Sequence, residues 1–199
     1  MQEAFIAKIE QYILEAQDNG LVLLFHDPMH QIHNNVNGYC WQETGKAGTI
    51  QVRANSGRRR LNIMGALNPL TLRPTVFLSE ENCDKEMMKI FLQEIRGEYP
   101  RPQRIVIILD NARYQRAYEV QEEAKRLGIT LEFLPPYSPN LNLIERLWKY
   151  FKKEVMQNSY YPTFDQFFQR TVEFFRTIES RQLELKTLLT LNFEIIKAS

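Results

Sequence analysis

The stretch RIVIILD, residues 104–110, constrains the fold more than any other part of the sequence. It is short and apolar on both faces, which is the pattern of a strand inside a sheet that helices cover on both sides. A helical pattern follows at 113–128 and a second apolar strand pattern at 129–135. Strand, helix and strand in this order predict parallel strands joined by a crossover helix, and therefore an α/β fold.

The rest of the chain adds antiparallel strands and further helices to this sheet. Strand patterns at 59–67 and 72–79 flank the turn signal Asn68-Pro69 and predict a hairpin. A further apolar strand is predicted at 21–27, and we expect residues 28–58 to be irregular. Helical spacing of apolar residues predicts helices over 2–18, 84–98, about 140–157, and from 160 onward.

These elements predict one domain with a short appendage. We assign residues 1–158 to a single domain that includes the N-terminal helix, and residues 159–199 to a C-terminal helical extension on the same core. A chain of 199 residues is long enough for a core of this kind.

Composition excludes several classes of protein. The net charge is +1, so a polyanion partner has to be met by local patches rather than by the whole surface. Two cysteines, Cys40 and Cys83, are too few for a disulfide framework, and they favour a reducing cytoplasm. The longest apolar runs are too short to span a bilayer, so we predict no membrane partner.

Three acids stand where elements of the predicted sheet end or begin. Asp27 ends the first strand and Asp110 ends the central one. Sites in open parallel sheets form at the carboxyl ends of the strands, so these two acids are expected to share a crevice. The turn PPYSPN brings the chain back to this edge and starts the helix that carries Glu145. Taken alone, each Asp is more often a turn former or a helix cap, and Glu145 is more often a solvated helix residue.

A cluster of three carboxylates has a chemical use. Carboxylates within a few ångströms of one another repel and raise each other's pKa, and divalent cations remove that penalty. Ligand sets made only of oxygen suit Mg²⁺ or Mn²⁺, and two such ions can promote phosphoryl transfer. The pattern therefore predicts a site for two Mg²⁺ or Mn²⁺ ions at Asp27, Asp110 and Glu145.

Three segments together resemble a known family. LLFHDPMHQIHN, IVIILDNARYQ and LPPYSPNLNLIERLWKYFKKEV look like the catalytic core of DDE transposases, in the bacterial insertion-sequence branch of the mariner superfamily. The 34 residues between Asp110 and Glu145 match the spacing of the last two acids in that branch. The resemblance covers roughly residues 20 to 157.

The resemblance implies a ribonuclease-H-like fold with Asp27, Asp110 and Glu145 at the three metal positions. It also implies hydrolysis of DNA at transposon ends and strand transfer of the 3′-hydroxyl into target DNA. A homodimer acting on double-stranded DNA is the expected active form. Family members carry helix-turn-helix DNA-recognition modules, and we recognise none in this sequence, so a separately encoded DNA-binding chain is one expectation. Many relatives have a His after the Asp-Asn pair, where this sequence has Ala112 to Gln115.

Several polar residues are candidates for contacts with DNA. Arginine and lysine side chains can hold phosphates near a carboxylate site, although a solvated strand edge or helix face is an equally good interpretation. The candidates are Arg58, Arg59, Arg60, Asn111, Lys149, Lys152 and Lys153. A zinc site made by His26, His30 and His33 is a weaker alternative.

Two other functions remain open from the sequence. A catalytically inactive remnant would keep the fold and bind DNA or a partner chain without cutting. An unrelated Mg²⁺-dependent phosphohydrolase would need a glycine-rich phosphate loop, and no such loop is evident among 8 glycines.

Overall fold

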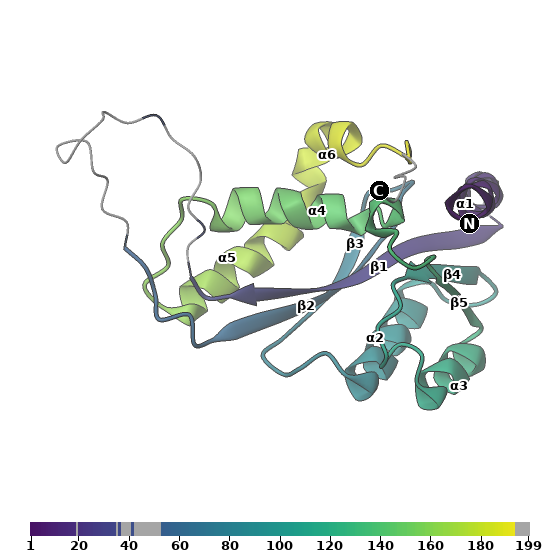
Figure 1. Cartoon of the computed structure of the whole chain (residues 1–199), viewed down its shortest axis with the longest axis horizontal. Helices are drawn as coiled ribbons and strands as arrows, with labels where there is room; N and C mark the ends of the chain where they lie inside the picture. The colour runs from purple at the N-terminus through teal and green to yellow at the C-terminus, as the bar shows by residue number, and fades with distance from the viewer. Residues whose placement is uncertain (19, 35, 37–40, 42–52, 194–199) are drawn as a thin grey trace.

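A five-stranded mixed sheet forms the centre of the protein (Figure 1). The computed structural model describes residues 1–18, 20–34, 36, 41 and 53–193. The strand order is β3-β2-β1-β4-β5. The strands are β1 (Leu21–Ile32), β2 (Arg60–Leu67), β3 (Pro74–Ser79), β4 (Arg104–Leu109) and β5 (Ile129–Phe133).

The sheet changes from parallel to antiparallel pairing along β1. Residues Leu21 to Phe25 pair in parallel with β4, and β4 pairs in parallel with β5. From Phe25 to Ile32, β1 pairs with β2 in the antiparallel sense, and β2 pairs likewise with β3. The predicted combination of a three-stranded antiparallel part and parallel strands is confirmed.

The predicted end of the first strand was wrong. β1 does not end at Asp27, because β2 continues to supply hydrogen-bonding partners as far as Ile32. Only the parallel pairing to β4 ends near Asp27. Five residues of the stretch that we expected to be irregular, 28–32, are therefore strand. Much of the remainder of that stretch, with Cys40, lies outside the described residues.

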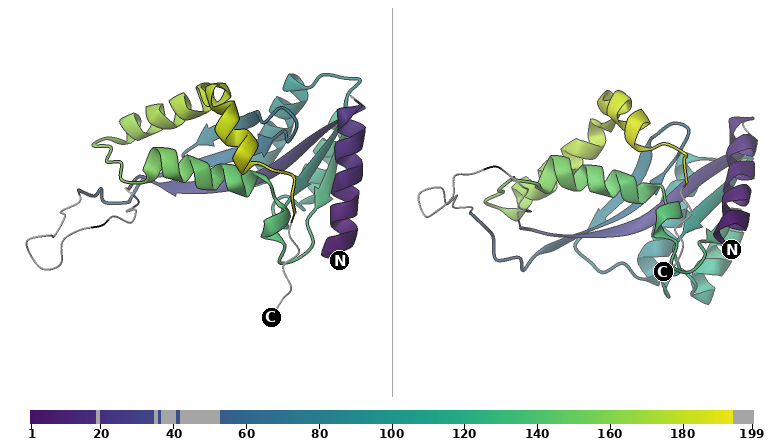
Figure 2. Two further views of the ribbon diagram at one scale, coloured as in Figure 1. Left: turned by 90° about the horizontal axis from the view of Figure 1, so that it is seen from above. Right: turned by 45° about the horizontal axis from the view of Figure 1, so that its top comes forward.

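Helices cover both faces of the sheet (Figures 1 and 2). One face carries α2 (Lys85–Glu98) and α3 (Tyr118–Leu127), whose apolar side chains join those of Val22, Leu24 and Ile107. The other face carries α1, α4, α5 and α6, which pack on Leu23 and Phe25. Their bounds are Gln2–Gln17, Ile144–Phe151, Phe164–Arg176 and Gln182–Leu188.

Two predicted helices differ in detail from the observed ones. α3 begins at Tyr118 rather than near 113, because the residues after Asp110 form consecutive turns, with Gln115 N–H donating to Ala112 O. The predicted helix over 140–157 has three parts. A 3₁₀ turn (Pro139–Leu141) precedes α4, and a π-helical turn (Lys152–Met156) follows it.

The alternation of side chains along the strands decides which face carries polar groups. Leu23 and Phe25 of β1 and Val106 and Ile108 of β4 pack on the face that α4 covers. Because successive side chains in a strand point to opposite faces, Asp27 continues this row in β1. Asp110 occupies the equivalent position directly after β4. Both acids therefore face the helix that carries Glu145.

The C-terminal helices pack on the core of the sheet. Phe167 and Phe174 of α5 are fully buried in the same cluster as Phe151 of α4. Thr163 and Gln166 form a capping box at the start of α5, which fixes where this helix begins. The division at 158/159 stays a prediction. In the part of the chain that the structure describes, no helix is long and apolar enough to cross a membrane.

Candidate active site

Asp27, Asp110 and Glu145 line one cavity of about 540 Å³. Asp27 lies in β1 opposite Gly65, Asp110 follows β4 directly, and Glu145 lies in the first turn of α4. The wall of the cavity is completed by the chain that connects β5 to α4, from Leu134 to Pro139. Three elements that are far apart in sequence thus bring their acids to one place.

The turn after β5 is held at both of its ends. Asn111 Nδ2 donates to Leu134 O at 2.7 Å, which ties the end of β5 to the end of β4. Asn142, which is 3% exposed, donates from Nδ2 to the backbone oxygen of His26 at 2.9 Å. Asn142 thereby connects the start of α4 to β1, one residue before Asp27. These two bonds fix the place from which Glu145 enters the cavity.

Asp27 is a carboxylic acid with a strongly raised pKa. Burial, followed by repulsion from Asp110 and Glu145, raises the pKa of Asp27 to about 7. The indole N–H of Trp148 donates to Asp27 Oδ2 at 3.1 Å and offsets part of this rise, as does the charge of Lys152. Asp27 is therefore a partly protonated carboxylic acid near neutral pH unless a cation is bound beside it.

The other two acids have different surroundings. Asp110 Oδ1 accepts the backbone N–H of Ala112 at 3.2 Å, which closes the turn after β4. Burial raises the pKa of Glu145, the charge of Lys149 lowers it and that of Asp110 raises it again. Both Asp27 and Glu145 therefore have raised pKa values, in each case partly because of the negative charge of Asp110.

The donor atoms fit a hard divalent cation in type and in charge. All three side chains offer carboxylate oxygen, and their mutual repulsion is the penalty that a cation would remove. Within the described residues, no three His, Cys, Asp or Glu side chains converge closely enough to form a ready-made metal site. Binding of a cation would therefore have to draw the carboxylates together.

The histidines beside Asp27 do not form a zinc site. His26 is fully buried, its Nδ1 donates to Gly65 O at 2.8 Å, and burial lowers its pKa to about 4. His30 pairs with Asn62, and His33 bonds to the backbone of Tyr161. Since each ring has a different partner, the zinc alternative is wrong for these residues.

Comparisons with known proteins agree with this geometry. Residues 22–168, most of the chain, match the family described as DDE superfamily endonuclease. The chain belongs to this DDE endonuclease family. The matched residues include all three acids and end inside α5.

One curated relative also matches. An uncharacterized protein of Sinorhizobium fredii, y4pE/y4sA, is 32% identical over 83 residues, which are 42% of this chain and 59% of the relative.

Solved structures of a mariner transposase share the fold. The Mos1 strand transfer complex superposes with a TM-score of 0.65 at 12% identity over 98% of this chain and 60% of the Mos1 chain. A Mos1 paired end complex with Mg gives 0.64 at 14% identity, over 98% of this chain and 61% of that one. The catalytic domain of Mos1 mariner transposase gives a TM-score of 0.57 at 12% identity, over 93% of this chain and 88% of that one.

These likenesses confirm the predicted ribonuclease-H-like fold. The chain spans about 60% of the length of the Mos1 chains in the two complexes. Assignment to the bacterial insertion-sequence branch stays a prediction.

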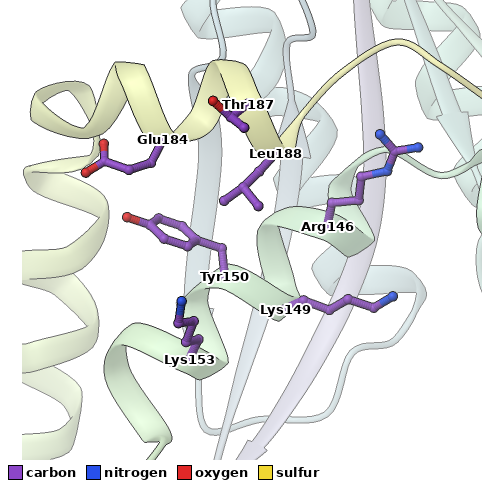
Figure 3. A pocket seen from close by; sticks show the side chains of 7 residues that line it. All are labelled: Arg146, Lys149, Tyr150, Lys153, Glu184, Thr187 and Leu188. Carbon is purple, nitrogen blue, oxygen red and sulfur yellow. The ribbon is translucent and has the colours of Figure 1, made fainter.

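The lysines Lys149, Lys152 and Lys153 line cavities on two sides of α4. Lys149 and Lys152 line a cavity of about 300 Å³ beside Asp27 and Glu145. Lys153 lies on the other side, in a cavity of about 530 Å³ between α4 and α6 that Lys149 also borders. Figure 3 shows this second cavity, with Tyr150 and Leu188 between the two helices. Lys149 and Lys152 are therefore the better placed to meet a substrate of the acids.

Arg146, the residue after Glu145, has a structural role. The guanidinium of Arg146 donates to the backbone oxygens of Thr190 at 2.6 Å and Asn192 at 2.8 Å. It holds the segment after α6 against α4.

The arginines 58–60 lie away from the acids. Arg60 pairs with Ile32, five positions along β1 from Asp27, and its guanidinium donates to Asn82. Arg59 forms a salt bridge with Glu80 at 2.7 Å and stacks over the ring of Phe164. Arg58 is exposed. Neither cavity beside the acids is lined by these three residues.

Asn111 lines the cavity of the acids, but both ends of its amide bind protein groups. Nδ2 donates to Leu134 O, and Oδ1 accepts from Arg116. The structure therefore gives Asn111 a supporting position, and its contact with DNA stays a prediction.

Sequence reasoning missed three residues that shape the site. Asn142, Trp148 and Gly65 all contact the β1 segment at Asp27 or the groups that hold it. None of them was assigned a role at the site from the sequence. One sequence signal could have identified Asn142. It stands between Leu141 and Leu143, and an amide in an apolar stretch needs a hydrogen-bond partner if it is buried.

Proposed function

We propose that this chain is the catalytic part of a DNA transposase, which hydrolyses phosphodiester bonds at transposon ends and transfers the 3′-hydroxyl to target DNA. One observation carries the proposal: three carboxylates, from β1, from the residue after β4 and from α4, share a cavity, and the pKa values of Asp27 and Glu145 are raised by burial and in part by the charge of Asp110. Membership of the DDE superfamily endonuclease family supports it.

Asp27, Asp110 and Glu145 would hold the divalent cations, Mg²⁺ or Mn²⁺, and we propose two ions. When bound, such ions neutralise phosphate charge and activate an attacking oxygen. Mos1 paired end complexes have been solved with Mg and with Mn, which supports this choice of metals. With a pKa near 7, Asp27 has to release a proton in part of the molecules before a cation binds.

Other side chains would orient the substrate. Lys149 and Lys152 border Asp27 and Glu145 and have the charge to hold the phosphates of a DNA strand at the acids. The buried bonds of Asn142 and Trp148 keep β1 and α4 in register while the substrate binds. Positioning and charge neutralisation supply most of the rate enhancement in phosphoryl transfer, and these residues provide both.

The proposed partner is double-stranded DNA, bound by two copies of the chain. Mos1 has been solved as a paired-end complex with a transposon end, which supports a homodimer on two DNA ends. A separately encoded DNA-binding chain is a further proposal for recognition of the ends. Light scattering of the protein with short end-like duplexes measures whether two copies assemble.

A second candidate is the inactive remnant that binds DNA without cutting it. The absence of a converged metal cluster among the described residues favours it. It predicts DNA binding that is indifferent to Mn²⁺ and to loss of the acids.

Incubation of the purified chain with duplex DNA and Mn²⁺ or Mg²⁺ separates the two candidates. The readout is nicking or strand joining on a denaturing gel, with Asp110→Ala beside the wild type and Asp165→Ala, an exposed acid of α5, as the matched control. The transposase predicts metal-dependent products that Asp110→Ala abolishes and Asp165→Ala retains. No products from any of the three proteins would support the remnant.

A further inference from the structure

The buried indole N–H of Trp148 has a carboxylate as its hydrogen-bond partner. Its side chain is 4% exposed and packs against Phe175, with ring centroids 6.3 Å apart. The indole N–H could have found a backbone oxygen, as buried tryptophans often do. It donates instead to Asp27 Oδ2 at 3.1 Å. The hydrogen bond thus stabilises the charged form of a carboxylate whose pKa is raised by burial and by two neighbouring acids, Asp110 and Glu145.

Gly65 makes this contact sterically feasible. It lies directly opposite Asp27 in the β1–β2 pairing. A Cβ at Gly65 would lie 2.7 Å from Trp148 Cζ2, closer still to Cη2, and 3.1 Å from Ile144 Cδ1. Because real Cβ atoms do not approach so closely, any other residue at 65 would displace the indole. The glycine therefore serves the packing of α4 on β2.

Glu145 and Trp148 stand three residues apart on α4, so they lie on neighbouring parts of one helix face. The same helix thus supplies one acid of the site and the donor that holds another. A shift of α4 along the sheet would move Glu145 and release Asp27 together.

We propose that Trp148 is a positioning residue for Asp27. Its N–H occupies Oδ2 and turns the carboxylate so that the other oxygen is presented to a divalent cation in the cavity, while Gly65 leaves the space for the indole. This inference rests on the proposed function, since it concerns the same cation site. Outer partners of metal ligands commonly change affinity by about 10- to 100-fold.

The competing account is that Trp148 only fills space. Trp148→Phe removes the N–H and keeps most of the apolar contact. Phe175→Leu is the matched control, because it loosens the packing around the indole and keeps the donor. Positioning predicts Mn²⁺ binding weakened about 10-fold in Trp148→Phe and unchanged in Phe175→Leu, as measured by calorimetric titration. Equal affinity in wild type and Trp148→Phe would overturn the proposal.

A second pair of variants covers the case in which Trp148→Phe does not fold. Gly65→Ala keeps the tryptophan but pushes its indole away from Asp27, and we expect weaker Mn²⁺ binding. Gly97→Ala in α2 is the control, because its Cβ would meet nothing within 4 Å. Unchanged affinity in a folded Gly65→Ala protein would contradict the proposed role of the indole.

Fluorescence reports on the contact without any variant of the site. The chain has two tryptophans, and Trp41 is fully exposed, so Trp41→Phe leaves Trp148 as the sole tryptophan, which can be excited selectively over tyrosine. Paramagnetic Mn²⁺ bound at Asp27 should quench Trp148 with the affinity found by calorimetry. Binding without quenching would overturn the positioning role and leave the proposed function intact. No binding of Mn²⁺ by the wild-type chain would overturn both.

Discussion

Two groups of like charges in this protein have opposite surroundings. Asp27, Asp110 and Glu145 share a cavity, and burial and mutual repulsion hold the pKa values of Asp27 and Glu145 above their usual range. Arg59 and Arg60 lie on the surface and have partners within the protein, Glu80 and Asn82. The two arginines already have an ion-pair or hydrogen-bond partner within the protein, whereas the acids need a positive charge from outside it.

The two groups also differ in how the chain supports them. The arginines form one continuous run at the start of β2, so a local stretch of sequence places them. The acids come from three separate parts of the chain, and hydrogen bonds from Asn142 and Trp148 join two of these parts, α4 and β1. Polar side chains that are buried and hydrogen-bonded in this way are expected at a functional site rather than at a solvated edge.

The largest expected effect is loss of cleavage when one acid of the cavity loses its charge. Glu145→Gln preserves shape and removes the carboxylate, so we expect the rate of metal-dependent DNA cleavage to fall by at least about 10³-fold. The comparison with the arginines is tested by Arg59→Ala, for which we expect less than about a tenfold change. A cleavage time course on labelled duplex DNA measures both. Equal losses would remove the distinction between the two groups.

The next effect is on the dependence of stability on pH. The folded-state pKa of Asp27 is about 7 and its ordinary value is 3.8, so between these values the folded protein binds more protons than the unfolded one. The contribution of Asp27 to stability therefore falls as pH rises from about 4 to 7, by roughly 2–4 kcal/mol in metal-free buffer. Urea unfolding of wild type and Asp27→Asn across this range measures the difference.

The buried His26 acts in the opposite direction. Its folded-state pKa of about 4 lies below the ordinary value of 6.5, so its contribution to stability falls as pH drops through this range. Because His26 is present in both proteins, its effect cancels in the difference between wild type and Asp27→Asn. A difference that grows in favour of wild type with rising pH would contradict the account of Asp27.

A smaller effect is expected from the buried amide that joins α4 to β1. Asn142→Ala leaves the buried oxygen of His26 without its donor, and we expect a loss of about 1–3 kcal/mol in the free energy of unfolding. Asn82→Ala is the matched change in the arginine region, where the amide is exposed, and about 0.5 kcal/mol or less is expected. Denaturant midpoints of both variants report the contrast, and a costlier loss at Asn82 would reverse it.

The smallest expected effect concerns DNA affinity. Lys152 borders the cavity of the acids, so Lys152→Ala should lower the slope of log affinity against log salt concentration by about 1. Arg59→Ala should change this slope less, because its guanidinium is held by Glu80. Fluorescence anisotropy at several salt concentrations gives both slopes. A larger change for Arg59 would make the arginine run a DNA contact and restore the prediction from the sequence.

The sequence predicted the sheet well because its signals are local. The apolar run of β4, the hairpin of β2 and β3, and the strand–helix–strand order after Arg104 all appear as expected. The end of β1 was missed because its continuation depends on pairing with β2, which is about thirty residues away. Such long-range pairing produces no recognisable pattern in the sequence of β1 itself. The late start of α3 follows from the turns that Asp110 helps to close.

The candidate site was predictable only in part for the same reason. The positions and spacing of Asp27, Asp110 and Glu145 predicted that they share a site, and the structure places them around one cavity. The sequence did not indicate that Gly65 leaves space for Trp148, because this depends on how α4 packs across β2. It also could not tell Arg59, which Glu80 neutralises, from Lys152, which faces the acids.

The most direct test of whether the three acids form a site for divalent cations is to locate Mn²⁺ by anomalous scattering in crystals of the chain grown with MnCl₂ at a pH above 7. We expect anomalous density in the cavity, contacted by carboxylate oxygens of Asp27, Asp110 and Glu145, and no such density in crystals of Asp110→Ala. Density elsewhere, or an empty cavity in the presence of saturating Mn²⁺, would contradict it.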